Sequence, residues 1–78
     1  MAKRKSVVHG DVVILDTLNF GWSTTTIWDG PFGSNVTFRG TLEKGEFAIV
    51  VDVKDHFVEI VTPKGVRGWV PWRRVARV

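Results

Sequence analysis

The sequence has no cysteine, no tyrosine and no long apolar run. Without cysteine the chain cannot form a disulfide framework or a thiolate zinc site. No apolar segment approaches the roughly 20 residues that a membrane-spanning helix needs. The first residues, "MAKRKSVVHG", lack the apolar stretch of about 7–15 residues that a secretory signal requires. These absences lead us to expect a cytoplasmic location.

A sustained apolar period of 3.6 residues, which marks an amphipathic helix, is also missing. Short β-branched or alternating runs are present instead, separated by glycine, proline and asparagine breakers. The 78 residues suffice for one domain. We therefore predict an all-β fold, with a basic arm over residues 1–10 and a single domain over residues 11–78.

Five or six short strands are expected. The strongest candidates are residues 11–16, 46–53, 57–62, 67–70 and 75–78, and residues 24–28 and 36–38 could each form a further short strand. Residues 46–53 alternate, with Phe47, Ile49, Val51 and Val53 on one face and Ala48, Val50 and Asp52 on the other. One of these faces should therefore lie on the core. The segment "PWRR" favours one tight helical turn before the last strand.

Motifs of the carboxyl-terminal part resemble those of bacterial Src-homology-3-type (SH3-like) domains. They are "DGPFGSNVTFRGTLEKGE", "FVEI" and "GVRGWVP" in that order, with Gly-x-Leu-x-x-Gly at 40–45 and Gly-x-x-Gly-Trp-Val at 65–70. The resemblance covers about residues 25–78. It implies a small SH3-like barrel of five or six short antiparallel strands, with a long aromatic loop after the first strand. Bacterial relatives are often wall-binding or interaction modules, which implies a binding function.

Eukaryotic Src-homology-3 domains hold polyproline ligands on a shelf of Tyr, Trp, Pro and Tyr, and of these Pro71 is retained here. Arg74 stands where the shelf tyrosine after the proline is expected, and His56 or Phe57 stands in place of the tryptophan. We therefore do not expect polyproline recognition by this shelf.

Two glycines and the same proline fit the predicted turns. Gly45 suits a turn that needs a positive φ. Gly68 lies next to Trp69 and suits a close crossing of two strands. Pro71 lacks a backbone N–H and should end its strand.

Aromatic residues supply the candidate ligand-binding site. Phe20, Trp22, Trp28 and Phe32 lie in the long stretch after the first strand, and His56, Phe57, Pro71 and Trp72 complete the candidate set. The alternative is that the rings of the long stretch cover the open end of the barrel, because each aromatic side chain buries about 150–250 Å². We expect Trp69 to be in or near the core.

Basic residues supply an alternative site, for nucleic acid. The set comprises Lys3, Arg4 and Lys5 near the amino terminus and Arg67, Arg73, Arg74 and Arg77 near the carboxyl terminus. The arginines would neutralise phosphates and a tryptophan could stack on an unpaired base. The net charge of +3 is modest, so these residues could equally form a solvated face.

The sequence offers no set of residues for catalysis. The two histidines, His9 and His56, have no cysteine or close third ligand beside them, so we expect no metal site. No serine has a nearby histidine and acid, and a barrel this small rarely has the pocket that acid–base chemistry needs. We therefore expect neither an enzyme nor a cofactor.

The sequence therefore predicts a non-catalytic binding or assembly module that recognises a protein or peptide partner, or a second copy of itself, through the aromatic residues. A small basic nucleic-acid-binding barrel is the first alternative, and a cell-wall-targeting domain is the second. We expect no membrane partner.

Overall fold

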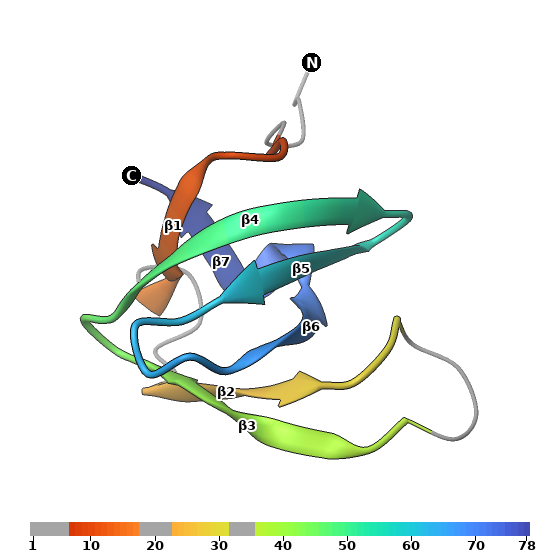
Figure 1. The fold of residues 1–78 in the computed structure, drawn as a ribbon. Helices are drawn as coiled ribbons and strands as arrows, with labels where there is room; N and C mark the ends of the chain where they lie inside the picture. The colour runs from red at the N-terminus through yellow and green to blue at the C-terminus, as the bar shows by residue number, and fades with distance from the viewer. Residues whose placement is uncertain (1–6, 18–22, 32–35) are drawn as a thin grey trace.

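The computed structural model describes residues 7–17, 23–31 and 36–78. These residues form seven strands and one turn of 3-10 helix, η1 (Figure 1). In chain order the elements are β1 (Val12–Leu15), β2 (Thr24–Trp28), β3 (Phe38–Glu43), β4 (Phe47–Lys54), β5 (Phe57–Val61), β6 (Arg67–Pro71), η1 (Trp72–Arg74) and β7 (Val75–Arg77).

The seven strands form one antiparallel sheet in the order β3-β2-β6-β5-β4-β1-β7. β4, β5 and β6 are consecutive neighbours, and the last strand, β7, returns to pair with the first, β1 (Figure 1). The predicted all-β class is confirmed. The number of strands exceeds the expected five or six because β2 and β3 form a hairpin within the stretch after β1.

Most strand positions agree with the sequence prediction, and β3 does not. The expected strand at residues 36–38 is instead a longer strand that begins at Phe38 and continues to Glu43. It continues through Gly40, where the register with β2 shifts between Ile27 and Trp28. A glycine within a strand often marks such a bulge. Gly40 therefore makes the strand irregular but does not end it.

The core lies on one face of the sheet and is built mainly from branched aliphatic side chains. Alternate residues of each strand point inward, and directly paired residues share a face. The inward set consists of Val13, Leu15, Ile27, Leu42, Ala48, Val50, Val58, Ile60, Val70 and Val75. Each of these is at most 2% exposed.

β4 turns its smaller side chains toward the core. Ala48 and Val50 are buried, whereas Phe47 and Ile49 are 55% and 50% exposed. The register with β1 decides this, because Ala48 lies opposite the buried Val13. The larger apolar side chains of this half of β4 therefore lie on the outer face.

A second irregularity changes the faces of β4 beyond Val50. The ladder with β5 shifts between Val50 and Asp52, and Asp52 then lies opposite Glu59. Glu59 points outward, since its neighbours Val58 and Ile60 are core residues. The predicted common face of Ala48, Val50 and Asp52 is therefore wrong for Asp52, because the bulge turns it outward.

Gly68 and Gly45 have the roles that the sequence predicted. A Cβ atom on Gly68 would lie 2.5 Å from Cγ2 of Ile27 and closer still to the carbonyl oxygen of Trp28, so β2 and β6 can approach each other only with glycine here. Gly45 has a φ of 89° in the turn between β3 and β4. Pro71 is the last residue of β6, and η1 follows it.

The end of the expected basic arm is attached to the sheet. Val7 is 7% exposed and belongs to the core cluster, and the N–H of Gly10 donates a hydrogen bond to the carbonyl of Val50 (2.7 Å). Val7 and Gly10 therefore contact the rest of the fold.

In the described residues, no helix has the length and apolar character needed to cross a lipid bilayer.

Candidate functional site

The turn between β4 and β5 is linked to η1 by two hydrogen bonds. The backbone N–H of Trp72 donates to the carbonyl of His56 (2.8 Å), and Nε1 of Trp72 donates to Nδ1 of His56 (3.3 Å). An indole N–H can only donate, so Nδ1 of His56 is the acceptor of this bond. Trp72 also packs against the core cluster. These contacts fix the orientation of its ring.

Two cross-strand pairs hold further rings on the outer face of the sheet. Phe57 and Pro71 are paired between β5 and β6, and Trp28 and Trp69 are paired between β2 and β6. Trp69 and Pro71 are two residues apart in β6, so they point the same way. Trp69 is 8% exposed, and Trp28, Phe57 and Pro71 are half-buried.

These three pairs of residues are what we call the aromatic surface. Its members are Trp28, His56, Phe57, Trp69, Pro71 and Trp72. They come from three separate parts of the chain: the end of β2, the β4–β5 turn with the start of β5, and the end of β6 with η1.

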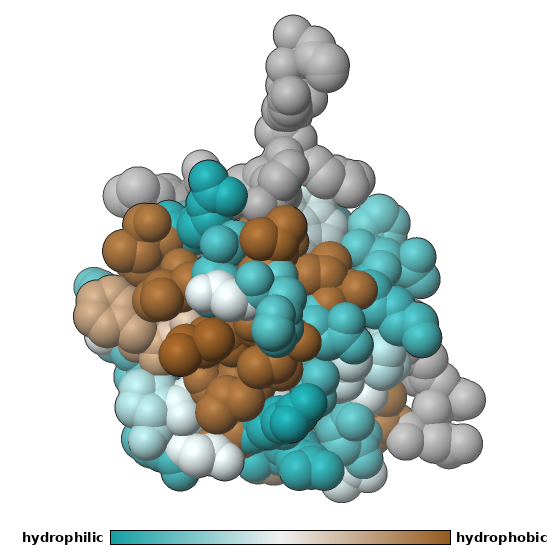
Figure 2. Space-filling view, turned by 45° about the horizontal axis from the view of Figure 1, so that its top comes forward, coloured by the Kyte–Doolittle hydropathy of each residue, from teal (hydrophilic) through white to brown (hydrophobic). Residues whose placement is uncertain are grey.

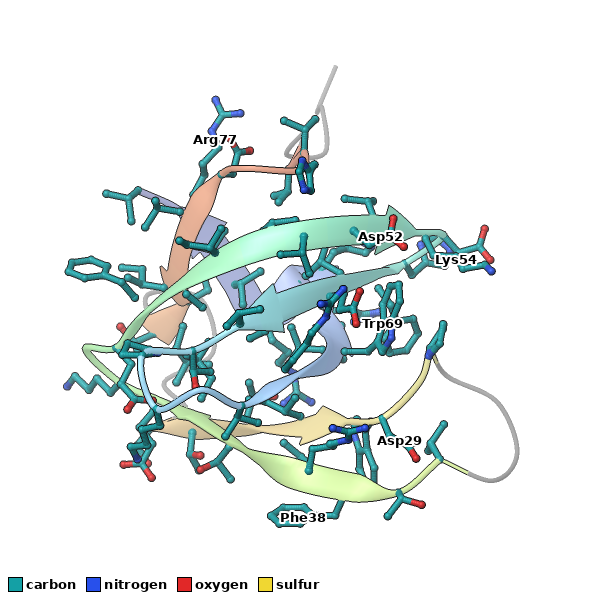
Figure 3. The ribbon with its side chains drawn as sticks, viewed as in Figure 1. Asp29, Phe38, Asp52, Lys54, Trp69 and Arg77 are labelled. Carbon is teal, nitrogen blue, oxygen red and sulfur yellow. The ribbon has the colours of Figure 1, made fainter. Side chains whose placement is uncertain are left out.

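Carboxylates border the aromatic surface. Glu59 is paired with Trp69, and Asp52 is paired with Glu59, so the row continues across β5 and β4. Figure 3 shows Trp69 on the side of the molecule where Asp52 and Asp29 also lie.

The three carboxylates have different partners. Glu59 accepts a hydrogen bond from Nε of Arg67 (3.1 Å), which balances its charge. Oδ1 of Asp29 accepts one from the backbone N–H of Thr37 (2.7 Å), and Oδ1 of Asp52 accepts one from the N–H of Val53 (2.8 Å). Lys54 is exposed and lies opposite Phe57, so the border of the aromatic surface carries charges of both signs.

The structure brings together five of the eight predicted ligand-binding residues: Trp28, His56, Phe57, Pro71 and Trp72. The other three, Phe20, Trp22 and Phe32, lie outside the described residues.

The four carboxyl-terminal arginines of the alternative site are spread over β6, η1 and β7. Arg67 pairs with Glu59, and NH1 of Arg77 lies 3.7 Å from Oδ2 of Asp11. NH1 of Arg74 donates to Oγ1 of Thr25 (3.4 Å). Arg73 is exposed. Lys3, Arg4 and Lys5 lie outside the described residues. To bind nucleic acid, Arg67 and Arg77 would therefore have to give up these carboxylate partners and pair with phosphates.

Trp69 and Glu59 belong to this region, although they are not among the site residues that the sequence predicted. Trp69 is buried, as expected, but it points away from the core, because its neighbours Gly68 and Val70 face inward. Counting alternate residues along the expected strand at residues 67–70 would have found this orientation. The pairing of Trp69 with Trp28 joins distant segments and had no local signal.

Over residues 7–17, 23–31 and 36–78, no three His, Asp or Glu side chains are grouped so that they could hold a metal ion.

Comparison of the chain with models of known protein families, with curated proteins and with solved structures gives no match.

Proposed function

We propose that the chain is a non-catalytic binding module with an SH3-like barrel, and that it holds a peptide segment of a partner on the aromatic surface. The observation that carries this proposal is the convergence of Trp28, His56, Phe57, Pro71 and Trp72 from three parts of the chain. Such rings offer large, rigid contact areas, and tryptophan is enriched among residues that dominate binding energy.

The fold supports the SH3-like part of the proposal. The first and last strands pair, three consecutive strands form the middle of the sheet, and a helical turn precedes the last strand. The order of the sequence motifs fits this arrangement, and the segment "GVRGWVP" contributes Trp69 and Pro71 to the aromatic surface.

The exposed carboxylates of the border can bind a positive charge on the peptide. Asp29 and Asp52 are exposed, and a lysine or arginine side chain of the partner would gain both from these carboxylates and from the face of an indole ring.

Selection of random peptides displayed on phage, with the domain immobilised, tests the proposal. Enriched peptides should bind the soluble domain with a change in tryptophan emission, and Trp28→Ala and Phe57→Ala should each weaken binding at least about tenfold. Lys64→Ala is the control, because Lys64 lies in the β5–β6 turn and pairs with Glu46. Peptides that bind the Trp28→Ala and Phe57→Ala variants equally well would contradict the proposal.

A salt series with oligonucleotides distinguishes the alternative. Quenching of tryptophan emission by single-stranded DNA that fades steeply with salt, and is lost in Arg73→Glu, would favour the nucleic-acid module. We expect no such quenching at physiological salt.

A further inference from the structure

β1 and the first half of β4 are apolar on both faces. Their inward residues are in the core, yet Val12, Phe47 and Ile49 on the outer face are 40%, 55% and 50% exposed. An antiparallel sheet with one solvated face normally alternates apolar and polar residues. β4 follows that rule in its second half, where Asp52 and Lys54 lie outside. The apolar outer face is therefore confined to one part of the sheet.

This face contains a hollow of about 490 Å³. Its apolar lining consists of Val12, Phe47, Ile49, Val61, Pro63 and Val78. Thr62 also lines it, but its Oγ1 already accepts a hydrogen bond from the N–H of Val66 (3.2 Å). Figure 2 shows hydrophobic residues gathered on this side of the molecule with hydrophilic residues around them. We call these six residues the apolar face.

Two ion pairs flank the apolar face. Nζ of Lys64 lies 3.4 Å from Oε2 of Glu46, and NH1 of Arg77 lies 3.7 Å from Oδ2 of Asp11. Each of the four charged residues is the chain neighbour of a lining residue. The border therefore carries one positive and one negative charge at each end, and it has no excess of either sign that would select a charged partner.

We propose that the apolar face binds the same face of a second copy of this chain, related to the first by a two-fold axis. Phe47 is exposed and lies at the hollow, of which it forms part of the lining. In a symmetric contact, the Phe47 side chain of each copy can therefore enter the hollow of the other copy. Each ion pair can also exchange partners across such a contact, because both ends of the face carry a cation and an anion. A face that is complementary to itself in both shape and charge fits a second copy.

The small exposed area leads us to expect a weak dimer. The exposed fractions of Val12, Phe47, Ile49 and Val78 correspond to roughly 400 Å² of apolar surface, the size of a functional patch on a monomer. Two such faces bury roughly 800 Å², which is below the roughly 1,200 Å² of the smallest stable interfaces. We therefore expect a reversible dimer with a Kd between about 10 µM and 1 mM.

Sedimentation equilibrium over that concentration range tests the proposal. The unchanged chain should shift from monomer toward dimer, and Ile49→Lys should remain monomeric throughout. Val53→Lys is the matched control, because Val53 is on the same strand, is 43% exposed and lies outside the apolar face. Far-ultraviolet circular dichroism shows whether each variant is folded. A chain that stays monomeric at about 1 mM, or a dimer that Ile49→Lys leaves intact, would overturn the proposal.

Cross-linking gives a second measurement that does not depend on the lysine variant. Since the chain contains no cysteine, a single introduced cysteine can form only an intermolecular disulfide. Ile49→Cys should be oxidised to a covalent dimer much faster than Val53→Cys at the same concentration. Equal rates would contradict the proposed interface. If the unchanged chain is monomeric and binds an apolar dye that Ile49→Lys does not bind, the face serves a different apolar partner and the proposal is wrong.

Discussion

Trp28 and Trp69 are the paired residues through which the β2–β3 hairpin joins the rest of the sheet. Their contact depends on the residue beside them, Gly68, whose missing side chain lets the Trp28 carbonyl come close to β6. The same two residues belong to the aromatic surface. The pairing that attaches the hairpin to the sheet therefore also brings Trp28 to the candidate site.

Gly68→Ala should lower the free energy of unfolding by about 2–4 kcal/mol, because the added methyl group would overlap the backbone of Trp28 and the side chain of Ile27. Urea unfolding measures this change. Gly30→Ala is the control, since its added atom would meet Cγ1 of Val36 at an ordinary 3.7 Å. Equal stability of the two variants would show that β2 does not approach β6 as closely as described.

Two neighbouring residues of β4 test which face lies on the core. Val50→Ala removes two buried methyl groups and should lower the free energy of unfolding by about 1.5–3 kcal/mol. Ile49→Ala removes a larger but half-exposed group and should cost less than about 1 kcal/mol. Unfolding of dilute protein, at concentrations where the chain is monomeric, gives both values. The reverse order would place Ile49 on the core face.

The hydrogen bond between Trp72 and His56 predicts that His56 holds the indole ring in place. Nδ1 of His56 accepts the bond from Nε1 of Trp72, and an indole N–H can only donate. His56→Ala should therefore change the tryptophan emission and weaken peptide binding. Emission spectra and peptide titrations measure the two effects, with Lys64→Ala as the control. An emission spectrum and a peptide affinity equal to those of the unchanged chain would contradict the prediction.

Glu46 makes a contribution to the stability of the fold that depends on pH. The pKa of Glu46 is lowered from its ordinary value of 4.5, mainly because its carboxylate accepts a hydrogen bond from the backbone N–H of Glu43 (3.0 Å) and secondly because Lys64 is near, with partial desolvation opposing both. A lowered carboxyl pKa stabilises the fold at pH values above the pKa of the unfolded chain. The stabilisation disappears as the pH falls through the folded value.

Glu46→Gln should therefore be less stable than the unchanged chain at neutral pH, and the two should become equally stable in acid. Urea unfolding as a function of pH gives the difference. Asp55→Asn, in the exposed β4–β5 turn, is the control for losing one negative charge from the surface. A Glu46→Gln difference that stays constant from neutral to acid pH would contradict the assignment.

Local patterns of the sequence were enough to predict most of the secondary structure. Runs such as "DVVILD" and "FVEIVT" are β-branched and bounded by turn residues, and both became strands at the expected places. The helical turn after Pro71, the turn at Gly45 and the close approach at Gly68 were also predicted. Each depends on residues that are adjacent in the chain, so the chain itself carries the signal.

The candidate site could be predicted only in part. Phe57 and Pro71 were both predicted as site residues, but their common face follows from the register between β5 and β6, which the sequence did not predict. The pairing of Trp28 with Trp69 and the contact between His56 and Trp72 each join segments that are far apart in the sequence. No local pattern states which of them meet.

The sequence by itself therefore determined that the chain is all-β, where most strands lie and which positions require glycine or proline. Only the tertiary structure decided which face of β4 is buried. The alternation of Phe47, Ala48, Ile49 and Val50 allows either choice, and pairing of Ala48 with the buried Val13 of β1 selects one. The bulge that turns Asp52 outward is likewise a property of two paired strands. A period of two residues fixes that two faces exist, and packing against distant strands fixes which of them meets water.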